Sequence, residues 1–470
     1  MSGTYLGLFG LDAVNLLAGF ALLYATGVAR LRLLDLRLVG LAYLGGFALM
    51  GTLLSLVAMA GIPLGIPTVV VTGGVVAAVC VAVARVRPNE LAQVALRAWS
   101  PPAFAAATAG GVVIAIGAVA ALVTAFTSFW TPDFDLLVAW LPRAKIVWAL
   151  HGLAPSQWSN FLDPWYPPLV PVMFGTTFEF VGGFHPSLLP IQQAILGIAF
   201  VLAMLVLLDR VAPRWISVPS LALLITTPWF WWRMQSLLPD STLAYLISAA
   251  AVVTLIWLWE PNRAWLVLGV IFLAAATLTK LEGSVFAALL AVVATGAAVI
   301  LRRRRGLAAL VLLLGPAATV PWRLWLDAHS VAATNPDLNQ PSLLNPSFLV
   351  SRSGDFAHAM YLILHSPWRS YYRTTEAILV IGLLVVLVAA RRVPVIAAAA
   401  LLWLGLVVLA LATTYATSRL NTDAYFAVSG SRVGGLVVVA AATMTPLLLG
   451  LAMRAPARVR QRAQNARASE

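Results

Sequence analysis

FWTPDFDLLVAWLPRAKIVWALHGLAPSQWSNFLDPWYPPLVP, residues 129–171, is the stretch around which this chain of 470 residues is organised. It contains three aspartates, five tryptophans, Arg143, Lys145 and a Tyr-Pro-Pro turn at 166–168. The sequence on both sides is almost entirely apolar. Charges and aromatic rings gathered in one loop of such a chain indicate that its polar chemistry takes place there.

The composition is that of an integral membrane protein. Apolar residues make up 61% of the chain and charged residues only 10%, whereas soluble domains average about a quarter charged. The start of the chain has no basic segment and carries Asp12, so we expect no cleavable signal peptide. The single cysteine, Cys80, excludes an internal disulfide and a metal cluster held by cysteines.

Apolar stretches of about 20 residues predict an all-α bundle of thirteen membrane spans. The predicted spans are 9–29, 38–61, 67–85, 103–128, 187–208, 216–232, 239–259, 264–280, 284–300, 307–326, 376–390, 394–412 and 433–453. This register puts 20 of the 30 basic residues, but only five of the 17 acids, into the loops on one side. Because short basic loops stay cytoplasmic, we expect the N-terminus outside and the C-terminus inside. The net charge of +13 then reflects topology, and we expect no nucleic-acid partner.

One apolar segment does not fit as a span. Residues 166–183 are apolar enough, but three prolines disfavour a regular helix at their start, and counting them would move the four-arginine run 302–305 outside. We expect a helix that lies at the outer interface or dips into the membrane. The chain shows no internal repeat, and we divide it into accessory helices (1–100), a core (101–453) and a basic tail (454–470).

The first outer loop offers both a phosphate site and a base. Pro142 predicts a short helix over 142–150, with Arg143 and Lys145 near its start. The helix dipole favours anions at that end, so these two cations do not stabilise the helix. These cations would suit a phosphate, or could simply pair with nearby aspartates or lipid headgroups. Asp135 in a tryptophan-rich pocket could accept a proton from a hydroxyl, or could merely cap a helix. Asp133 competes for the same role.

Other outer turns carry further charged groups, and each of these also has an ordinary structural explanation. Asp240 could be an N-cap, and Lys280 with Glu282 could be a simple ion pair in a turn. His358 and His365 are two helical turns apart, but no acidic partner completes a metal site, so we expect no metal.

Four motifs resemble those of the GT-C superfamily of membrane glycosyltransferases, which includes protein O-mannosyltransferases and lipid A aminoarabinose transferases. The run Asp135-Leu-Leu-Val-Ala-Trp140-Leu-Pro142-Arg143-Ala-Lys145, followed by Tyr166-Pro-Pro-Leu169, is similar to the first-loop signature of bacterial members. Weaker similarities are Leu238-Pro239-Asp240-Ser241, Thr279-Lys280-Leu281-Glu282-Gly283 and Ser431-Arg432. The similarity covers residues 129–435, but four spans precede the acidic loop, whereas the superfamily core has one.

The resemblance implies a multi-pass plasma (inner) membrane enzyme, its active site on the outer or periplasmic face. It would transfer a sugar from a polyprenyl-phosphate donor to a hydroxyl of an envelope glycan, lipid or protein, with inversion and without a cofactor. Asp135 or Asp133 would be the base, and the donor phosphate would bind Arg143, Lys145, Lys280 and Arg432. The sugar and acceptor region would include Trp140, Asp163, Tyr166, Asp240, Glu282 and His358.

Three other classes of protein are alternatives to this interpretation. A transporter or flippase of lipid-linked sugars would place ionisable groups near the middle of the membrane, whereas the predicted spans here are nearly free of charge. A structural scaffold would leave the dense array of outer charges unexplained. A ligase that moves a whole lipid-linked glycan would keep the same site and change only the group transferred.

Overall fold

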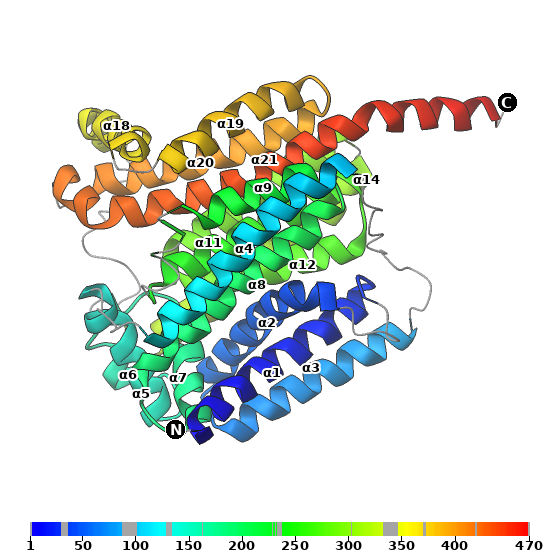
Figure 1. The fold of residues 1–470 in the computed structure, drawn as a ribbon. Helices are drawn as coiled ribbons and strands as arrows, with labels where there is room; N and C mark the ends of the chain where they lie inside the picture. Colours follow the sequence, from blue (N-terminus) through cyan, green and yellow to red (C-terminus); the bar gives the residue numbers. More distant parts are fainter. Residues whose placement is uncertain are drawn as a thin grey trace.

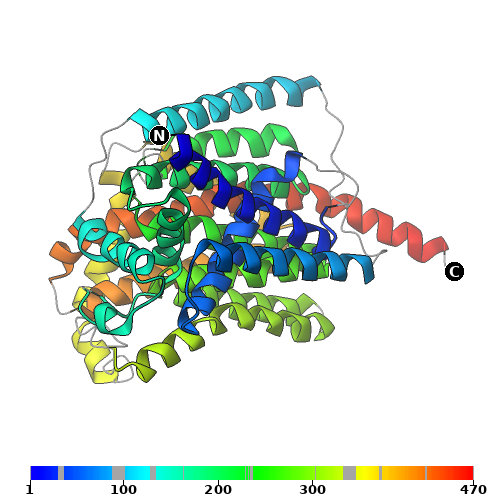
Figure 2. The same ribbon diagram turned by 90° about the horizontal axis from the view of Figure 1, so that it is seen from below.

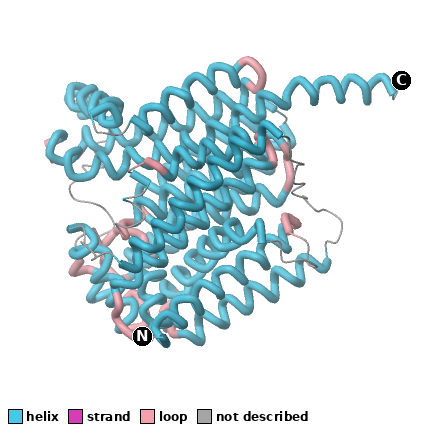
Figure 3. The backbone as a smooth tube through the Cα atoms, viewed as in Figure 1, coloured by secondary structure: helices cyan, strands magenta, loops and turns pink. Residues whose placement is uncertain are grey.

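The computed structural model describes residues 2–29, 36–86, 101–127, 134–161, 163–227, 229–230, 232, 237–301, 303–331, 346–369, 373–418 and 421–468. Within these ranges the chain is helical almost throughout and contains no β-strand (Figure 3). The all-α prediction is confirmed.

The helices follow the order of the predicted spans, with shorter helices between them. They are α1 (Ser2–Thr26), η1 (Leu36–Leu38), α2 (Val39–Met59), α3 (Ile66–Val86), α4 (Pro101–Thr127), η2 (Leu136–Trp140), α5 (Leu141–Ala149), α6 (Pro155–Trp158), α7 (Leu169–Val181), η3 (Pro186–Leu188), α8 (Leu189–Asp209), α9 (Arg214–Ile225), α11 (Pro239–Trp259), α12 (Arg263–Thr279), α13 (Leu281–Leu301), α14 (Arg303–Ala309), η4 (Leu310–Leu313), α15 (Leu314–Ala317), α16 (Thr319–Ala328), α17 (Pro346–Ser351), α18 (Ser353–Arg369), α19 (Arg373–Ala390), α20 (Pro394–Thr417) and α21 (Thr422–Ala468).

Ten helical segments of the described chain are long and apolar enough to cross a membrane. They are Gly3–Thr26, Leu36–Met59, Ile66–Val86, Ala105–Thr127, Pro186–Asp209, Pro239–Trp259, Leu281–Leu301, Gly306–Ala328, Pro394–Thr417 and Gly434–Pro456. The chain is therefore a multi-pass membrane protein, as its composition predicts.

The other three predicted spans correspond to shorter apolar helices, α9, α12 and the Thr375–Ala390 segment of α19. A count of thirteen stays a prediction. The segment 166–183 forms α7, a helix of 13 residues that is shorter than a bilayer core requires.

Helix α11 lies at the centre of the bundle. Its side chains are buried from Pro239 to Leu258, and it contacts α8, α12, α13, α20 and α21. Helices α18–α21 lie on one side of it and α1–α3 on the other (Figures 1 and 2). A helix buried all round can be uniformly apolar, which is why α11 shows no amphipathic pattern in the sequence.

Helices α1 and α2 are joined by close packing and by a hydrogen bond inside the membrane region. A Cβ on Gly46 of α2 would lie 1.7 Å from the carbonyl oxygen of Asn15, so the two backbones touch. The hydroxyl of Tyr43 donates to Asp12 at 2.6 Å. Small residues and interhelical hydrogen bonds are the usual means of helix association in lipid. Together with α3, this pair packs against α7, α8 and α12.

The two ends of the bundle differ in what they carry. The N-terminus and the short helices α5 and α6 lie at one end, and the final helix, α21, projects from the other (Figure 1). With 47 residues, α21 is roughly 70 Å long, so it runs through the bundle and continues into the basic tail.

Candidate functional site

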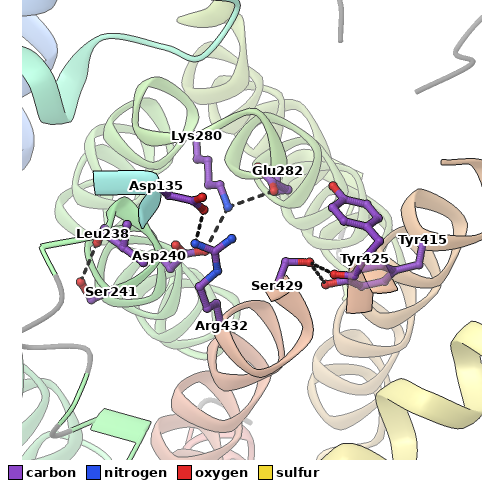
Figure 4. A network of polar contacts seen from close by, with 10 residues as sticks. All are labelled: Asp135, Leu238, Asp240, Ser241, Lys280, Glu282, Tyr415, Tyr425, Ser429 and Arg432. Carbon is purple, nitrogen blue, oxygen red and sulfur yellow. Dashed lines mark hydrogen bonds and ion pairs between the residues drawn. The ribbon is translucent and has the colours of Figure 1, made fainter. Parts of the chain in front are cut away.

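Five charged side chains from four separate segments converge at the end of the bundle that carries the first loop. Asp135 precedes η2, Asp240 lies in the first turn of α11, Lys280 and Glu282 come from the α12–α13 junction, and Arg432 lies on α21. Their charged groups point toward one another (Figure 4). We call these five residues, Asp135, Asp240, Lys280, Glu282 and Arg432, the charged cluster.

Lys280 is the centre of this cluster. It is the single residue between α12 and α13, with an extended backbone at φ −158° and ψ 157°. Its ammonium nitrogen lies 3.0 Å from Asp240 Oδ1 and 3.1 Å from Glu282 Oε1, and its side chain is only 10% exposed. The predicted turn and the Lys280–Glu282 ion pair are both confirmed, and Asp240 extends the pair to a triad.

Asp240 does not cap its helix. Leu238 occupies the N-cap position of α11, without a side-chain capping bond, and Pro239 opens the helix. The first turn is held instead by Gln193 of α8, whose amide donates to Ser241 Oγ at 2.7 Å, while Ser241 donates to the Leu238 carbonyl. The carboxylate of Asp240 is thereby directed to Lys280.

Asp135 pairs with Arg432, a residue far away in the sequence. Arg432 Nη1 donates to Asp135 Oδ2, joining residues 297 positions apart. Asp135 stands at the start of a π-helical turn and makes no side-chain capping bond there, so the N-cap interpretation does not hold. The Asp135 side chain is 31% exposed and that of Arg432 11%, so the pair lies at the edge of the cluster that solvent reaches.

Aromatic side chains form one wall of the site. The ring centroid of Tyr166 lies 5.9 Å from the Lys280 ammonium and 5.2 Å from the ring of Trp140. The sequence pairs Tyr166 with Trp140 in the first-loop signature, and both lie beside the charged cluster.

Tyr425 faces the same site from α21. Burial chiefly, together with Glu282 and Asp163, raises the pKa of Tyr425 to about 12, although Lys280 and Arg432 oppose the shift. Burial, with Glu282 next, also raises the pKa of Tyr166 well above its ordinary value. Both phenols therefore keep their protons at neutral pH and can donate hydrogen bonds.

Arg143 is enclosed by aromatic rings. Its side chain is fully buried, and its guanidinium carbon lies 5.4 Å from the ring of Trp140, 5.5 Å from Trp158 and 5.7 Å from Phe161. It donates to the backbone carbonyl of Asp163. Burial lowers the pKa of Arg143 to about 10, a value that still leaves it cationic at neutral pH. These contacts fix the fold of the first loop.

The same loop is fastened to the bundle by its tryptophans. The indole of Trp322 on α16 donates to the carbonyl of Trp165 at 2.9 Å, and the rings of Trp158 and Trp322 meet edge to face at 5.9 Å. The indole of Trp158 donates to Pro164 within the loop. Cation–π and ring contacts thus hold the loop that carries Asp135 and Tyr166 in place.

Not every predicted site residue joins the cluster. Lys145 is exposed, and its ammonium lies over the ring of Phe184. His358 of α18 contacts Asp423 at 2.9 Å, and both side chains are largely exposed. Asp163 lies in the left-handed region at φ 57° and influences Tyr166 and Tyr425 electrostatically. Asp133 lies outside the described residues.

Sequence reasoning missed the part of the site on α21 that precedes Arg432. Tyr425, Ser429 and Arg432 are spaced four and three residues apart, which places them on one face of a helix. The hydroxyls of Ser429 and Tyr415 are hydrogen-bonded, with 2.9 Å between their oxygens. The Ser429 hydroxyl also donates to the backbone carbonyl of Tyr425. Had helix been predicted for 422–432 rather than an outer loop, this spacing would have pointed to Tyr425.

Two further observations bear on ligands. Among the residues that the structure describes, no group of three or more His, Cys, Asp or Glu side chains could hold a metal ion. A large cavity lies between α4, α8 and α9, and none of the charged cluster lines it.

No family model, curated protein or solved structure matches this chain.

Proposed function

We propose that this protein is a membrane glycosyltransferase of the GT-C kind, which transfers a sugar from a polyprenyl-phosphate donor to a hydroxyl on the extracytoplasmic side. The observation that carries the proposal is the contact between Asp135 and Arg432 beside the Asp240–Lys280–Glu282 triad. Each of these residues belongs to one of the four motifs that resemble the superfamily.

The reaction is a single displacement. The acceptor oxygen attacks the anomeric carbon, the bond from that carbon to the phosphate oxygen breaks, and polyprenyl phosphate departs with the bonding electrons. The proton of the hydroxyl passes to a carboxylate. Cations fixed beside the departing phosphate stabilise the charge that develops there, which is usually the largest contribution to such catalysis.

Arg432 and Lys280 are the cations that lie where a phosphate could be bound, and Asp135 is the carboxylate nearest to solvent in the cluster. Arg432 donates a hydrogen bond to Asp135. A donor phosphate that engages Arg432 with paired hydrogen bonds would compete with this carboxylate and leave it ready to accept a proton. In this proposal Asp240 and Glu282 hold Lys280, and Arg143 holds the loop.

The predicted phosphate role of Lys145 and Arg143 stays a prediction, as does the role of Asp133. The contacts of Arg143 favour a structural role, because its guanidinium is occupied by three rings and a carbonyl.

The orientation follows from the arginines. Arg210 pairs with Glu260 at the end of α11 opposite to Asp240, and Arg37 and Arg214 line one cavity near the end of α8 beside it. The basic tail on α21 projects from the same end of the bundle (Figure 1). By the positive-inside rule that end would face the cytoplasm, which would put the charged cluster at the outer face.

The proposal is tested with purified protein in vesicles that contain a panel of polyprenyl-phosphate monosaccharides and a cell-envelope extract as acceptor. Mass spectrometry measures polyprenyl phosphate released and sugar gained by the acceptor. We expect Asp135→Asn to lose about 10²–10⁴-fold in transfer, the range for a lost general base. Asp355→Asn is the matched control, because Asp355, in the first turn of α18, is 43% exposed and forms an ion pair with Arg352.

Transfer by Asp135→Asn at the wild-type rate would remove Asp135 as the base, and an equal loss in Asp133→Asn would move the role there. Release of polyprenyl phosphate from no donor in the panel, combined with movement of intact lipid-linked sugar between leaflets, would favour a flippase instead.

A further inference from the structure

Two polar side chains lie inside the apolar pair of helices α1 and α2, outside the charged cluster. Asp12 and Asn15 are the tenth and thirteenth of the 24 residues of the apolar segment Gly3–Thr26, so both lie near the middle of a helix long enough to cross the membrane. Asp12 is 8% exposed and Asn15 is fully buried. The sugar transfer proposed above makes no use of either residue.

The protein satisfies only part of the hydrogen-bonding capacity of these two side chains. The hydroxyl of Tyr43 on α2 donates to Asp12 Oδ1 at 2.6 Å. The other carboxyl oxygen, Asp12 Oδ2, is buried and forms no hydrogen bond with any described residue, and the same is true of both Oδ1 and Nδ2 of Asn15. These three atoms require an explanation, because most buried polar side-chain atoms are hydrogen-bonded to protein or to ordered water.

The three atoms belong to one region of the structure. Asp12 and Asn15 are three positions apart on α1, so their side chains are neighbours on one face of the helix, with about 5–6 Å between their Cβ atoms. Asp12 contacts Tyr43 of α2, and the backbone carbonyl of Asn15 lies against Gly46 of the same helix. The two helices lie side by side (Figures 1 and 2). The carboxyl and the amide therefore lie close together beside α2.

The apolar neighbours cannot satisfy these atoms. Leu8, Leu11 and Ala18, which lie one turn away along α1, are buried. Within the described part of the chain, Asp12 forms no ion pair. Lipid offers no hydrogen bonds, and a buried carboxyl or amide without a partner costs free energy. Ionisable groups within membrane spans are rare for this reason, and they mark functional sites.

The chemistry of these groups fits water better than a metal ion. A water molecule both donates and accepts, and a buried one makes about three hydrogen bonds. Two hydrogen bonds of about 2.8 Å from one water bridge roughly 5 Å, which suits side chains three positions apart on a helix. Hard cations such as Ca²⁺ and Mg²⁺ take about six oxygen ligands, whereas Asp12 Oδ2 and Asn15 Oδ1 supply two.

We propose that one water molecule is bound between α1 and α2, where it bridges Asp12 Oδ2 and the side-chain amide of Asn15. Tyr43 donates to the other carboxyl oxygen, so each oxygen of the carboxyl group has a partner inside the membrane. The water is a structural ligand of the accessory helices, because it allows a carboxyl group to lie at the contact between them. The proposal is independent of the proposed sugar transfer.

A comparison of two backgrounds tests the bridge in the full-length protein. Asn15→Leu takes away one support of the water and leaves Asp12 Oδ2 without a partner, so the equilibrium constant of unfolding in detergent micelles should rise about 5–150-fold. In a protein that already carries Asp12→Leu and Tyr43→Phe the carboxyl is absent. Asn15→Leu should there leave the constant unchanged or lower it.

Ser55→Ala on α2 is the matched control for the loss of a buried polar group. Ser55 is also fully buried, but its hydroxyl donates to the Gly51 carbonyl of its own helix at 2.7 Å. Its replacement should therefore change the equilibrium constant by the same factor in the wild type and in the Asp12→Leu/Tyr43→Phe background.

Infrared difference spectroscopy observes the water directly. The full-length protein in phosphatidylcholine vesicles is measured in ordinary water and in oxygen-18 water, and an O–H stretching band that shifts between the two belongs to bound water. We expect one such band in the wild type and in Ser55→Ala that is missing from Asn15→Leu. The Asp12→Leu/Tyr43→Phe protein should lack the same band, and it serves if Asn15→Leu fails to fold as judged by thermal melting.

Three results would overturn the proposal. If Asn15→Leu is as stable as the wild type or more stable, no water bridges the amide to Asp12. If the shifted band persists in the folded variants, the water that gives rise to it lies elsewhere. If exchange of choline for Na⁺ at constant ionic strength raises the melting temperature of the wild type but not of Asn15→Leu, the ligand is a cation instead.

Discussion

The two ends of this bundle both carry ion pairs, but they are built differently. At one end Arg214 pairs with Asp209, five residues away, and Arg210 pairs with Glu260 at the ends of neighbouring helices. At the other end Asp135 reaches Arg432 across 297 positions, and Lys280 holds two carboxylates in a nearly closed site. The first arrangement can form as local helix ends fold, whereas the second requires the whole bundle to be assembled.

This difference between the two ends indicates which of them carries the functional site. At the first end, Glu260 in the Arg210–Glu260 pair is 29% exposed, and ion pairs that water reaches contribute little. Charges withdrawn into a site among helices are costly unless they are paired, and a chain that keeps five of them together does so at some cost to stability. The charged cluster is such a place.

The largest expected difference between the ends concerns activity. Arg432→Gln should lower sugar transfer about 10²–10³-fold, because it removes a cation that we propose lies beside the departing phosphate. Arg210→Gln, at the other end, should leave transfer unchanged. The vesicle assay of polyprenyl phosphate release measures both. Equal losses in the two variants would mean that arginine removal acts through folding, and the comparison would fail.

The next difference concerns stability. Lys280→Met leaves Asp240 and Glu282 without their shared cation, and we expect it to lower the free energy of unfolding by about 3–5 kcal/mol. Arg210→Met, whose partner Glu260 is 29% exposed, should lower it by about 1 kcal/mol or less.

Denaturant unfolding in detergent micelles measures both variants. Combining Lys280→Met with Asp240→Asn and Glu282→Gln should recover most of the loss. If the triple variant is no more stable than Lys280→Met, the loss comes from packing and not from charge.

A smaller effect is expected at the turn that carries Lys280. A Cβ on Gly283 would lie 2.0 Å from the carbonyl oxygen of Ala276, so Gly283→Ala must push α13 away from α12. We expect a loss of about 1–3 kcal/mol and reduced sugar transfer. Gly296→Ala is the control on the same helix, because its Cβ meets nothing within 4 Å. Thermal melting measures both, and equal melting temperatures would show that the two helices are not in close contact.

The smallest expected effect is a dependence of stability on alkaline pH. The pKa of Tyr425 is raised to about 12 in the folded protein, against about 10 for an unfolded tyrosine. The neutral phenol therefore contributes stability below pH 10 that is lost as the pH rises through 12. The free energy of unfolding should fall less steeply between pH 10 and 12 in Tyr425→Phe than in the wild type, whereas the two curves should run parallel between pH 7 and 9. If the free energies of unfolding of the two proteins run parallel over the whole pH range, Tyr425 is not buried in the site.

Most of the helical architecture could be predicted from hydropathy, because lipid leaves no alternative to helix for an apolar run. The short helix at Leu141–Ala149 followed from Pro142, and the turn at Lys280 followed from its motif. The predicted length was wrong at α9, which ends at Ile225, whereas the predicted span continues to residue 232.

The site was harder to foresee, for reasons that are three-dimensional. Sequence shows that Arg143 lies near aspartates, but not that Trp140, Trp158 and Phe161 close around it. Motif similarity selected Asp135 and Arg432 separately, and only the packing of α21 brings them into contact. Tyr425 was not predicted, because its spacing from Ser429 and Arg432 indicates a shared face only if the helix is known to begin at Thr422.

The one-residue corner between α12 and α13 has a consequence for how the molecule could change. With Lys280 alone bridging two helices, any inserted or deleted neighbour would rotate one helix by about 100° relative to the other. This junction is therefore fixed in length, and the ammonium it carries moves only when two whole helices move with it.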